Sequence, residues 1–171
     1  VGVKRDGTIL AKDCKLTLDG GAYMSSSGLA AFQSYMHLEA LYRLPNVRYE
    51  GIRAYTNKTA SSMHRLQAYQ LAVLEEMVLE RIAEDLGLDS VELRKQHATQ
   101  PGDILPTGTH ITSFALRECI DKAVAVSGWR EKKGKLPPGR GIGIGCSGSY
   151  TGFAMGFRLN SSALVKFNED G

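Results

Sequence analysis

The feature that most constrains the fold is a polar loop that leads from a strand-like run into the longest amphipathic helix of the chain. The helix is expected from about Ala68 to Leu86, because apolar residues recur at three- and four-residue spacing: Leu71, Leu74, Val78, Ile82 and Leu86. Its carboxylates are expected mostly on the opposite, solvated face. Gly87 follows as a typical residue beyond a helix C-terminus.

The residues before this unit have strand patterns. Val1–Tyr23 predicts a hairpin with its turn at Asp6-Gly7. Residues 29–42 predict a helix, since apolar residues again follow helical spacing. Val47–Thr56 predicts a further strand. Gly51 within it indicates either a bulge or the close approach of another segment.

Shorter helices are expected after the long one. Asp89 is placed to cap the first of them, and Thr112 or Ser113 to cap another that runs to Ser127. Trp129 is expected to fold back into the core. The sequence thus predicts an α+β fold, with a mixed or antiparallel sheet and three main helices packed against it, in a single domain over residues 1–171.

The C-terminal part is expected to return to the sheet, through strands at Gly141–Tyr150 and Ala163–Phe167. Residues 143–148 have the glycine spacing of a dinucleotide-binding fingerprint. We reject that interpretation, because the motif requires a strand before it and a helix after it, and neither is indicated here. We interpret these glycines instead as small residues in a sheet that let another backbone segment come close.

Composition excludes several classes of function. The net charge of +3 is too small to indicate a nucleic-acid-binding surface. No apolar run approaches the roughly 18 residues of a membrane span. Cys14, Cys119 and Cys146 have neither zinc-site nor disulfide-framework spacing. They are expected to be reduced, in a cytoplasmic protein. The basic cluster Arg130–Lys135 is expected to be a solvated loop.

The loop before the long helix, about Thr56–Gln70, is the best place to look for a site. Arg65 would bring a fixed positive charge and five donors next to the free N–H groups of a helix start, an arrangement suited to an anion. Gln70, about a turn later, can donate and accept. From composition alone, a surface arginine and a surface glutamine remain the alternative.

Several stretches resemble, in the same order, the molybdenum-binding large subunit of the xanthine dehydrogenase and aldehyde oxidase family. They are spread over nearly the whole chain: Val3–Ile9, Leu18–Tyr23, Tyr42–Asn57, Glu76–Arg94, Arg117–Ile120 and Gly139–Ile144. Within that family, Trp129 and Gly134–Gly141 look most like the hydroxybenzoyl-CoA reductase large subunit.

The resemblance implies a molybdopterin-dependent oxidoreductase, of hydroxylase or aryl-CoA reductase type, that acts on an aromatic or heteroaromatic substrate. It places Arg65, Gln67 and Gln70 at the molybdenum–molybdopterin cofactor, with iron–sulfur and FAD partner subunits or domains. The chain lacks an initial Met and ends in a turn sequence, so it is expected to be an internal fragment. Catalytic residues and metal ligands are expected outside it, and the fragment alone to be inactive.

The loop departs from the family pattern Arg-Gly-Phe-Gly-x-Pro-Gln. Here the run is Arg65-Leu66-Gln67-Ala68-Tyr69-Gln70, which is one residue shorter and lacks the glycines and the proline. Glycines in such a loop let the backbone approach a ligand without a Cβ in the way. A non-catalytic relative, or a scaffold that binds a neighbouring subunit, is therefore an alternative, followed by an anion-binding module that uses Arg65 and the basic cluster.

Overall fold

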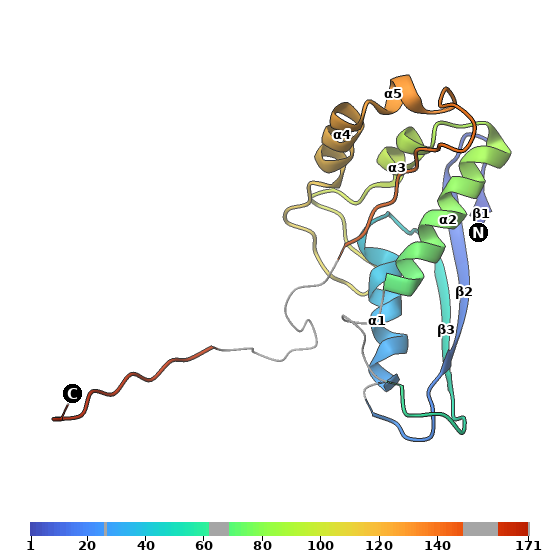
Figure 1. The fold of residues 1–171 in the computed structure, drawn as a ribbon. Helices are drawn as coiled ribbons and strands as arrows, with labels where there is room; N and C mark the ends of the chain where they lie inside the picture. Colours follow the sequence, from blue (N-terminus) through green and yellow to red (C-terminus); the bar gives the residue numbers. More distant parts are fainter. Residues whose placement is uncertain (26, 62–68, 149–160, 171) are drawn as a thin grey trace.

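A computed structural model describes residues 1–25, 27–61, 69–148 and 161–170, without the side chains of Ser27, Tyr69 and Gln70. A mixed three-stranded sheet in the order β1-β2-β3 lies on one side, with helices packed along it (Figure 1). The elements are β1 Gly2–Val3, β2 Ile9–Asp19, α1 Ser27–Ala40, β3 Val47–Ala54, α2 Tyr69–Leu86, α3 Ser90–His97, α4 Leu116–Ser127 and α5 Trp129–Lys132.

The predicted N-terminal hairpin and the α+β class are confirmed. β1 pairs antiparallel with β2, and Gly7 supplies the positive φ of 85° in the turn. β2 and β3 are parallel, with unbroken pairing from Lys12↔Val47 to Asp19↔Ala54, and α1 forms the crossover between them. Because the two strands run in the same direction, the segments that follow them leave from the same edge of the sheet.

Gly51 lies where α1 approaches the sheet. Its pairing with Leu16 continues without interruption, so the structure has the predicted close approach and no bulge. A Cβ at this position would lie 2.9 Å from the Cβ of Ala31 on α1. The absence of a side chain therefore sets how closely α1 packs on β3.

The predicted apolar face of α2 is wrong in part, since Leu71 is buried and Ile82 packs against the core but two members of the stripe are exposed. Leu74 and Val78 are 51% and 40% exposed, whereas Glu75 is only 6% exposed and lies between the buried Leu71 and Leu79. The reason is an ion pair: Glu75 accepts a hydrogen bond from the buried ammonium of Lys12 on β2. With its charge paired, a carboxylate can occupy a core position that periodicity assigns to an apolar residue.

The two predicted C-terminal strands are also wrong within the described residues. Residues 141–148 and 161–168 belong to no strand, and Leu164, Val165 and Phe167 are exposed. A β-strand needs a neighbouring strand to hydrogen-bond with. In the described part of the chain, no strand pairs with either of these segments. Ala163–Phe167 extends away from the body of the molecule (Figure 1).

The helices differ from the prediction in their number and in the cap of one of them. Among the described residues there are four helices of eight or more residues and the short α5, instead of three main helices. α4 begins at Leu116 after Ala115, with no side-chain cap, so the predicted cap at Thr112 or Ser113 is wrong. Asp89 does cap α3, and Trp129 is buried with Val91 and Ile120, as predicted.

Candidate functional site

The residues assigned to the cofactor by resemblance lie at the junction before α2. Arg65 and Gln67 fall in residues 62–68, outside the described part of the chain. Gln70 is the second residue of α2, and its side chain is not described. The structure therefore shows how the two flanks of this loop are held, while the assignment of Arg65, Gln67 and Gln70 to a cofactor stays a prediction.

The chain leading into the loop is bound to the turn that follows β2. Within this turn Gly20 N donates to Ala54 O at 2.8 Å, and Gly20 O accepts from Ser61 N at 3.1 Å. Ala22 N donates to Lys58 O at 2.9 Å. Backbone hydrogen bonds thus hold this segment up to Ser61, the last described residue before the loop.

The two glycines of this turn lie close to other parts of the chain. Gly21 has a φ of 70°, and a Cβ there would overlap the carbonyl oxygen of Thr59. A Cβ on Gly20 would overlap the guanidinium of Arg53. That guanidinium donates to Gly20 O at 2.7 Å and stacks on the Tyr55 ring at 4.2 Å. At Gly21 the neighbour is backbone, so only glycine fits there, whereas a side chain at Gly20 would require Arg53 to move.

A carboxylate adds side-chain contacts to this junction. Asp19 Oδ2 accepts from Lys58 Nζ at 2.6 Å, and Asp19 Oδ1 accepts from Thr56 Oγ1 at 2.5 Å and from Gly21 N at 3.3 Å. The hydrogen bond from Lys58, followed by those from Thr56 and Gly21, lowers the pKa of Asp19 to about 2. Asp19 is therefore an anion at neutral pH, with both oxygens engaged.

The helix beyond the loop is fixed to β2 by a second contact. The ion pair of Lys12 with Glu75 ties the second turn of α2 to the start of the strand. Burial raises the pKa of Glu75, against the opposing effect of Lys12. Because Lys12 and Asp19 lie toward opposite ends of β2, this one strand contacts the chain on both sides of the loop.

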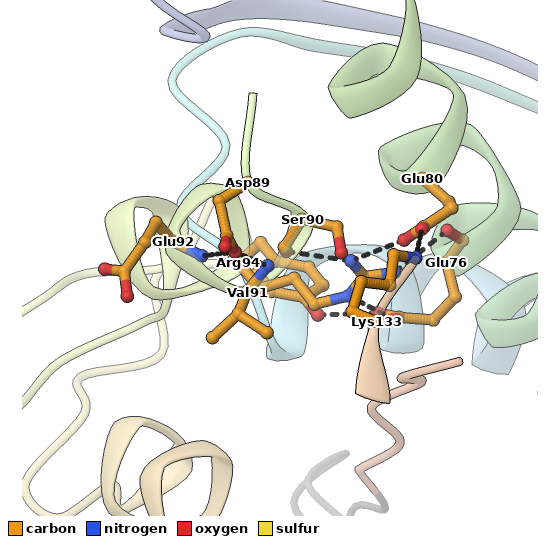
Figure 2. Close-up of polar contacts among 9 residues, drawn as sticks. Glu76, Glu80, Asp89, Ser90, Val91, Glu92, Arg94 and Lys133 are labelled. Atoms are coloured by element: carbon orange, nitrogen blue, oxygen red, sulfur yellow. Dashed lines mark hydrogen bonds and ion pairs between the residues drawn. The ribbon is translucent and has the colours of Figure 1, made fainter. Parts of the chain in front are cut away.

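The far side of α2 is held by a buried arginine on α3 (Figure 2). Arg94 has no exposed side-chain surface; its Nε donates to Glu76 Oε2 at 2.8 Å and its Nη1 to Glu80 Oε2 at 3.1 Å. Burial alone would raise the pKa of Glu80, but Lys133 and Arg94 more than offset it and hold that pKa below its usual value. Tyr42 donates to Glu76 Oε1 at 2.5 Å. Every carboxylate of this network has a cationic partner.

Next to this network a groove of about 520 Å³ runs between α2 and residues 142–147. Its lining is mainly apolar, with Glu76, Glu80 and Lys133 as charged members. Burial raises the pKa of the Cys146 thiol in its wall, so this thiol stays protonated at neutral pH. Since the charged groups of the groove already neutralise one another, we assign no ligand to it.

The start of α2 carries the sign of charge that suits an anionic group. No group of three or more His, Cys, Asp or Glu side chains that could hold a metal ion occurs among the described residues. The first turn of α2 carries no acidic residue, so the positive end of the helix dipole is not neutralised from within the helix. A phosphate-bearing group that approached this end would meet the positive end of the helix dipole.

Sequence reasoning located this junction but missed the residues that hold it. Asp19 and Lys12 both lie in Val1–Tyr23, for which the sequence predicts only a hairpin. Their partners lie 39 and 63 residues away, so no local pattern could reveal them. The remaining signal was Asp19-Gly20-Gly21 itself, since two glycines after an aspartate indicate a tight turn.

Comparison with known proteins finds that this chain is similar to one part of larger proteins. The profile of the molybdopterin cofactor-binding domain matches residues 1–98. The chain is 33% identical over 175 residues to an aldehyde oxidoreductase of Megalodesulfovibrio gigas, covering 98% of this chain and 19% of that protein. It is 31% identical over 180 residues to the xanthine dehydrogenase molybdenum-binding subunit of Escherichia coli O157:H7, covering 100% of this chain and 24% of that subunit.

The fold agrees with a solved structure. The aldehyde oxidoreductase from Desulfovibrio gigas superposes with a TM-score of 0.66 and 31% sequence identity, over 77% of this chain and 15% of that one. The chain thus spans between about a seventh and a quarter of the length of these relatives. The described residues contain no helix long and apolar enough to cross a membrane.

Proposed function

The chain belongs to the molybdopterin cofactor-binding domain family of xanthine dehydrogenases and aldehyde oxidoreductases, and on this premise we propose that it is one domain of the large subunit of a molybdopterin-dependent oxidoreductase. One observation carries the proposal. The family match over residues 1–98 includes β2, β3, α2 and the whole junction that holds the loop between them. The part of the chain that matches the family is thus also the part that the structure builds around residues 62–70.

In this proposal the loop and the start of α2 face the cofactor. Arg65 contributes a permanent positive charge for an anionic group, and Gln67 and Gln70 contribute amide hydrogen bonds. The acid-free first turn of α2 supports an anion at the same place. When bound, the molybdenum cofactor supplies the two-electron redox chemistry. The residues of this chain bind and orient it.

We further propose an aromatic or heteroaromatic substrate, and a hydroxybenzoyl-CoA reductase type of large subunit over a hydroxylase type. The similarity of Trp129 and Gly134–Gly141 to that type supports this choice. Iron–sulfur and FAD subunits or domains would relay the electrons to the cofactor in the reductase type, in a cytoplasmic complex. An assay panel of xanthine, an aromatic aldehyde and a hydroxybenzoyl-CoA thioester on the full-length protein separates these alternatives.

The remainder of the large subunit is the further partner that we propose. α2 exposes four large apolar side chains within its first ten residues: Val73, Leu74, Met77 and Val78. A contiguous apolar surface of this kind is typical of an interface. The relatives are four to five times longer than this chain, which supports a neighbouring domain of the same polypeptide as the covering surface.

A second candidate function has an observation of its own. The run Arg65–Gln70 lacks the glycines that let the family's loop approach the cofactor, and this favours a non-catalytic relative that serves as a scaffold for a neighbouring subunit. Such a protein would assemble normally and contain no cofactor.

Metal and pterin analysis of the full-length protein tests the proposal. Expressed in a host that makes molybdopterin, the protein is expected to contain molybdenum and pterin in near-stoichiometric amounts, and none when the host lacks the biosynthetic pathway. Assembly of a protein free of both molybdenum and pterin, from the competent host, would overturn the enzyme proposal and support the scaffold.

A further inference from the structure

We propose that the free edge of β2 is completed by a further strand of the same subunit, which continues β1 and covers the exposed apolar side chains Leu74 and Val78 of α2. The occupant is the stretch of the full-length polypeptide that leads into β1. The inference rests on the proposed function only in taking this chain as one domain of a larger subunit, and it does not depend on the cofactor. Nothing in the family match or in the relatives' names describes this surface.

In the described part of the chain, one edge of β2 has no neighbouring strand over most of its length. β2 runs from Ile9 to Asp19, and β1 pairs with it only at Ile9 and Ala11. From Lys12 onward the pairing partner is β3, which lies on the opposite side of β2 because the sheet order is β1-β2-β3. Figure 1 shows β1 beside the upper part of β2 and β3 along its length. The edge that β1 begins to cover is therefore open beyond Ala11.

The backbone groups along this edge point away from β3. Lys12 N donates to Asn46 O at 2.9 Å, on the β3 side of the strand. Successive residues of a strand direct their N–H and C=O groups to alternate sides, so those of Asp13, Lys15 and Thr17 face the open edge. Within the described residues these groups meet no hydrogen-bonding partner. Such a row of unpaired donors and acceptors is a template for a further strand.

An apolar groove runs along the inner side of the same edge. It has a volume of about 150 Å³, and Val1 lines it together with Leu74 and Val78 of α2. Among its charged members, Lys12 and Glu75 neutralise each other as a buried ion pair. Leu74 and Val78 are 51% and 40% exposed, so apolar surface lies uncovered where the sheet lacks a strand. One added strand would satisfy the backbone of β2 and bury these side chains together.

Continuity with β1 identifies the occupant. β1 already lies on this edge and runs antiparallel to β2, with Gly2 opposite Ala11. Because the strands are antiparallel, going backward along the chain from Gly2 means going forward along β2, past Lys12 and Cys14. Val1 already borders the groove. A strand that extends an existing pairing gains its hydrogen bonds without closing a new loop.

The register predicts the side chains of this strand, since residues opposite each other share a face of the sheet. Cys14 faces the helices and packs against the core cluster around Leu38. Lys15 is on the outer face, where it pairs with Glu50 at 3.5 Å, with side chains 62% and 47% accessible. The residues two and four positions before Val1 are therefore expected to be apolar and to face α2. Those one and three positions before Val1 are expected to be polar.

Amide hydrogen exchange in the full-length wild-type protein, resolved to single residues, tests whether the edge is covered. The amides of Lys15 and Thr17 face the edge, and those of Cys14 and Leu16 are the matched controls because they face β3. We expect Lys15 and Thr17 to exchange as slowly as the controls, at least about a hundredfold slower than a free amide. Exchange of Lys15 and Thr17 at the rate of free amides would mean that the edge is open, and the proposal would be wrong.

A disulfide in the full-length protein tests which segment covers the edge. A cysteine placed two positions before Val1 would lie opposite Cys14 in a non-hydrogen-bonded antiparallel pair, where Cα atoms are about 4.5 Å apart, a separation that a disulfide can bridge. On mild oxidation we expect an intramolecular disulfide with Cys14, identified by the mass of the linked peptides. A cysteine three positions before Val1 points to the other face and should form none, and Cys14→Ser should abolish the bond.

A protected edge without that disulfide would overturn the proposal, because another segment would then cover β2. A disulfide of Cys14 with a cysteine in Val165→Cys would identify Ala163–Phe167 as that segment, and a Cys14-linked dimer would identify a second copy. Neither measurement needs the cofactor. If the full-length protein contains no molybdopterin but has the protected edge and the disulfide, the proposed function fails and this inference stands.

Discussion

The Asp19 carboxylate and the Lys58 ammonium lie 2.6 Å apart, between Oδ2 and Nζ, although 39 residues separate them in the sequence. Their contact closes the edge of the sheet where the parallel strands β2 and β3 both end. The chain continues from there, through residues 62–68, to α2. This relationship connects the fold to the proposed cofactor loop.

The contacts of Asp19 should appear as a pH dependence of stability. Its pKa is about 2 in the folded protein, below the ordinary value of 3.8. A lowered carboxyl pKa stabilises the folded state above the unfolded pKa, and this contribution is lost as the pH falls through the folded pKa. We expect urea unfolding of the wild type to show this loss between about pH 4 and pH 2.

Asp19→Asn should have a flatter profile over the same pH range, because its side chain no longer titrates. Glu50→Gln is the control and should keep the wild-type slope. Equal slopes for the wild type and Asp19→Asn below pH 4 would contradict the hydrogen-bonded anion that the structure shows.

Arg94 should be among the residues whose loss costs most stability. Replacing it with methionine removes a fully buried guanidinium and leaves the largely buried Glu76 without its cationic partner. Breaking a buried pair in this way costs about 3–5 kcal/mol. The free energy of unfolding in urea measures the effect.

The exposed pair of Arg81 with Asp85, on α2, provides the comparison for Arg94. Arg81→Ala should change the free energy of unfolding by no more than about 1 kcal/mol, because exposed pairs contribute little. If Arg94→Met and Arg81→Ala lowered the free energy of unfolding by similar amounts, burial would not determine how much these arginines stabilise the fold.

The buried pair of Lys12 and Glu75 calls for a double replacement. Lys12→Met alone should destabilise the protein by about 3–5 kcal/mol, since it leaves Glu75 buried and unpaired. Replacing Glu75 by leucine in the same protein should recover most of that loss, because two apolar groups need no compensation. A double variant no more stable than the single one would mean that the pair itself, and not burial of an unpaired charge, holds α2 to β2.

Gly21→Ala tests the close approach at the turn. We expect it to cost more than the about 1–2 kcal/mol of left-handed strain, because its Cβ would also meet the backbone of Thr59. Gly87→Ala is the matched control, with a φ of 67° and open space around it, and should show the strain alone. If Gly21→Ala and Gly87→Ala lowered the free energy of unfolding in urea equally, the close approach at Gly21 would be contradicted.

Local patterns predicted much of the fold. The hairpin, β3, α1 and α2 were identified because their periodicities and turn residues are encoded within a few positions of each other. α2 was expected at Ala68–Leu86 and is found at Tyr69–Leu86. Its buried face could not be found in the same way, because the position of Glu75 depends on Lys12, 63 residues earlier.

The C-terminal segments show a different limit. Ala163–Phe167 has the composition of a strand, and a strand forms only when a neighbour accepts and donates its hydrogen bonds. Within the described residues no such neighbour pairs with it. For the candidate site, resemblance supplied Arg65, Gln67 and Gln70, which remain predictions, and the structure supplied Asp19, Thr56 and Lys58, which no spacing indicated.

The central claim is that residues 62–70 face the cofactor. The molybdopterin content of full-length Arg65→Ala, measured beside Arg81→Ala on the exposed face of α2, tests it most directly. We expect Arg65→Ala to lose cofactor about tenfold or more, at an unchanged melting temperature, while Arg81→Ala stays fully loaded. Wild-type cofactor content in Arg65→Ala would contradict the claim.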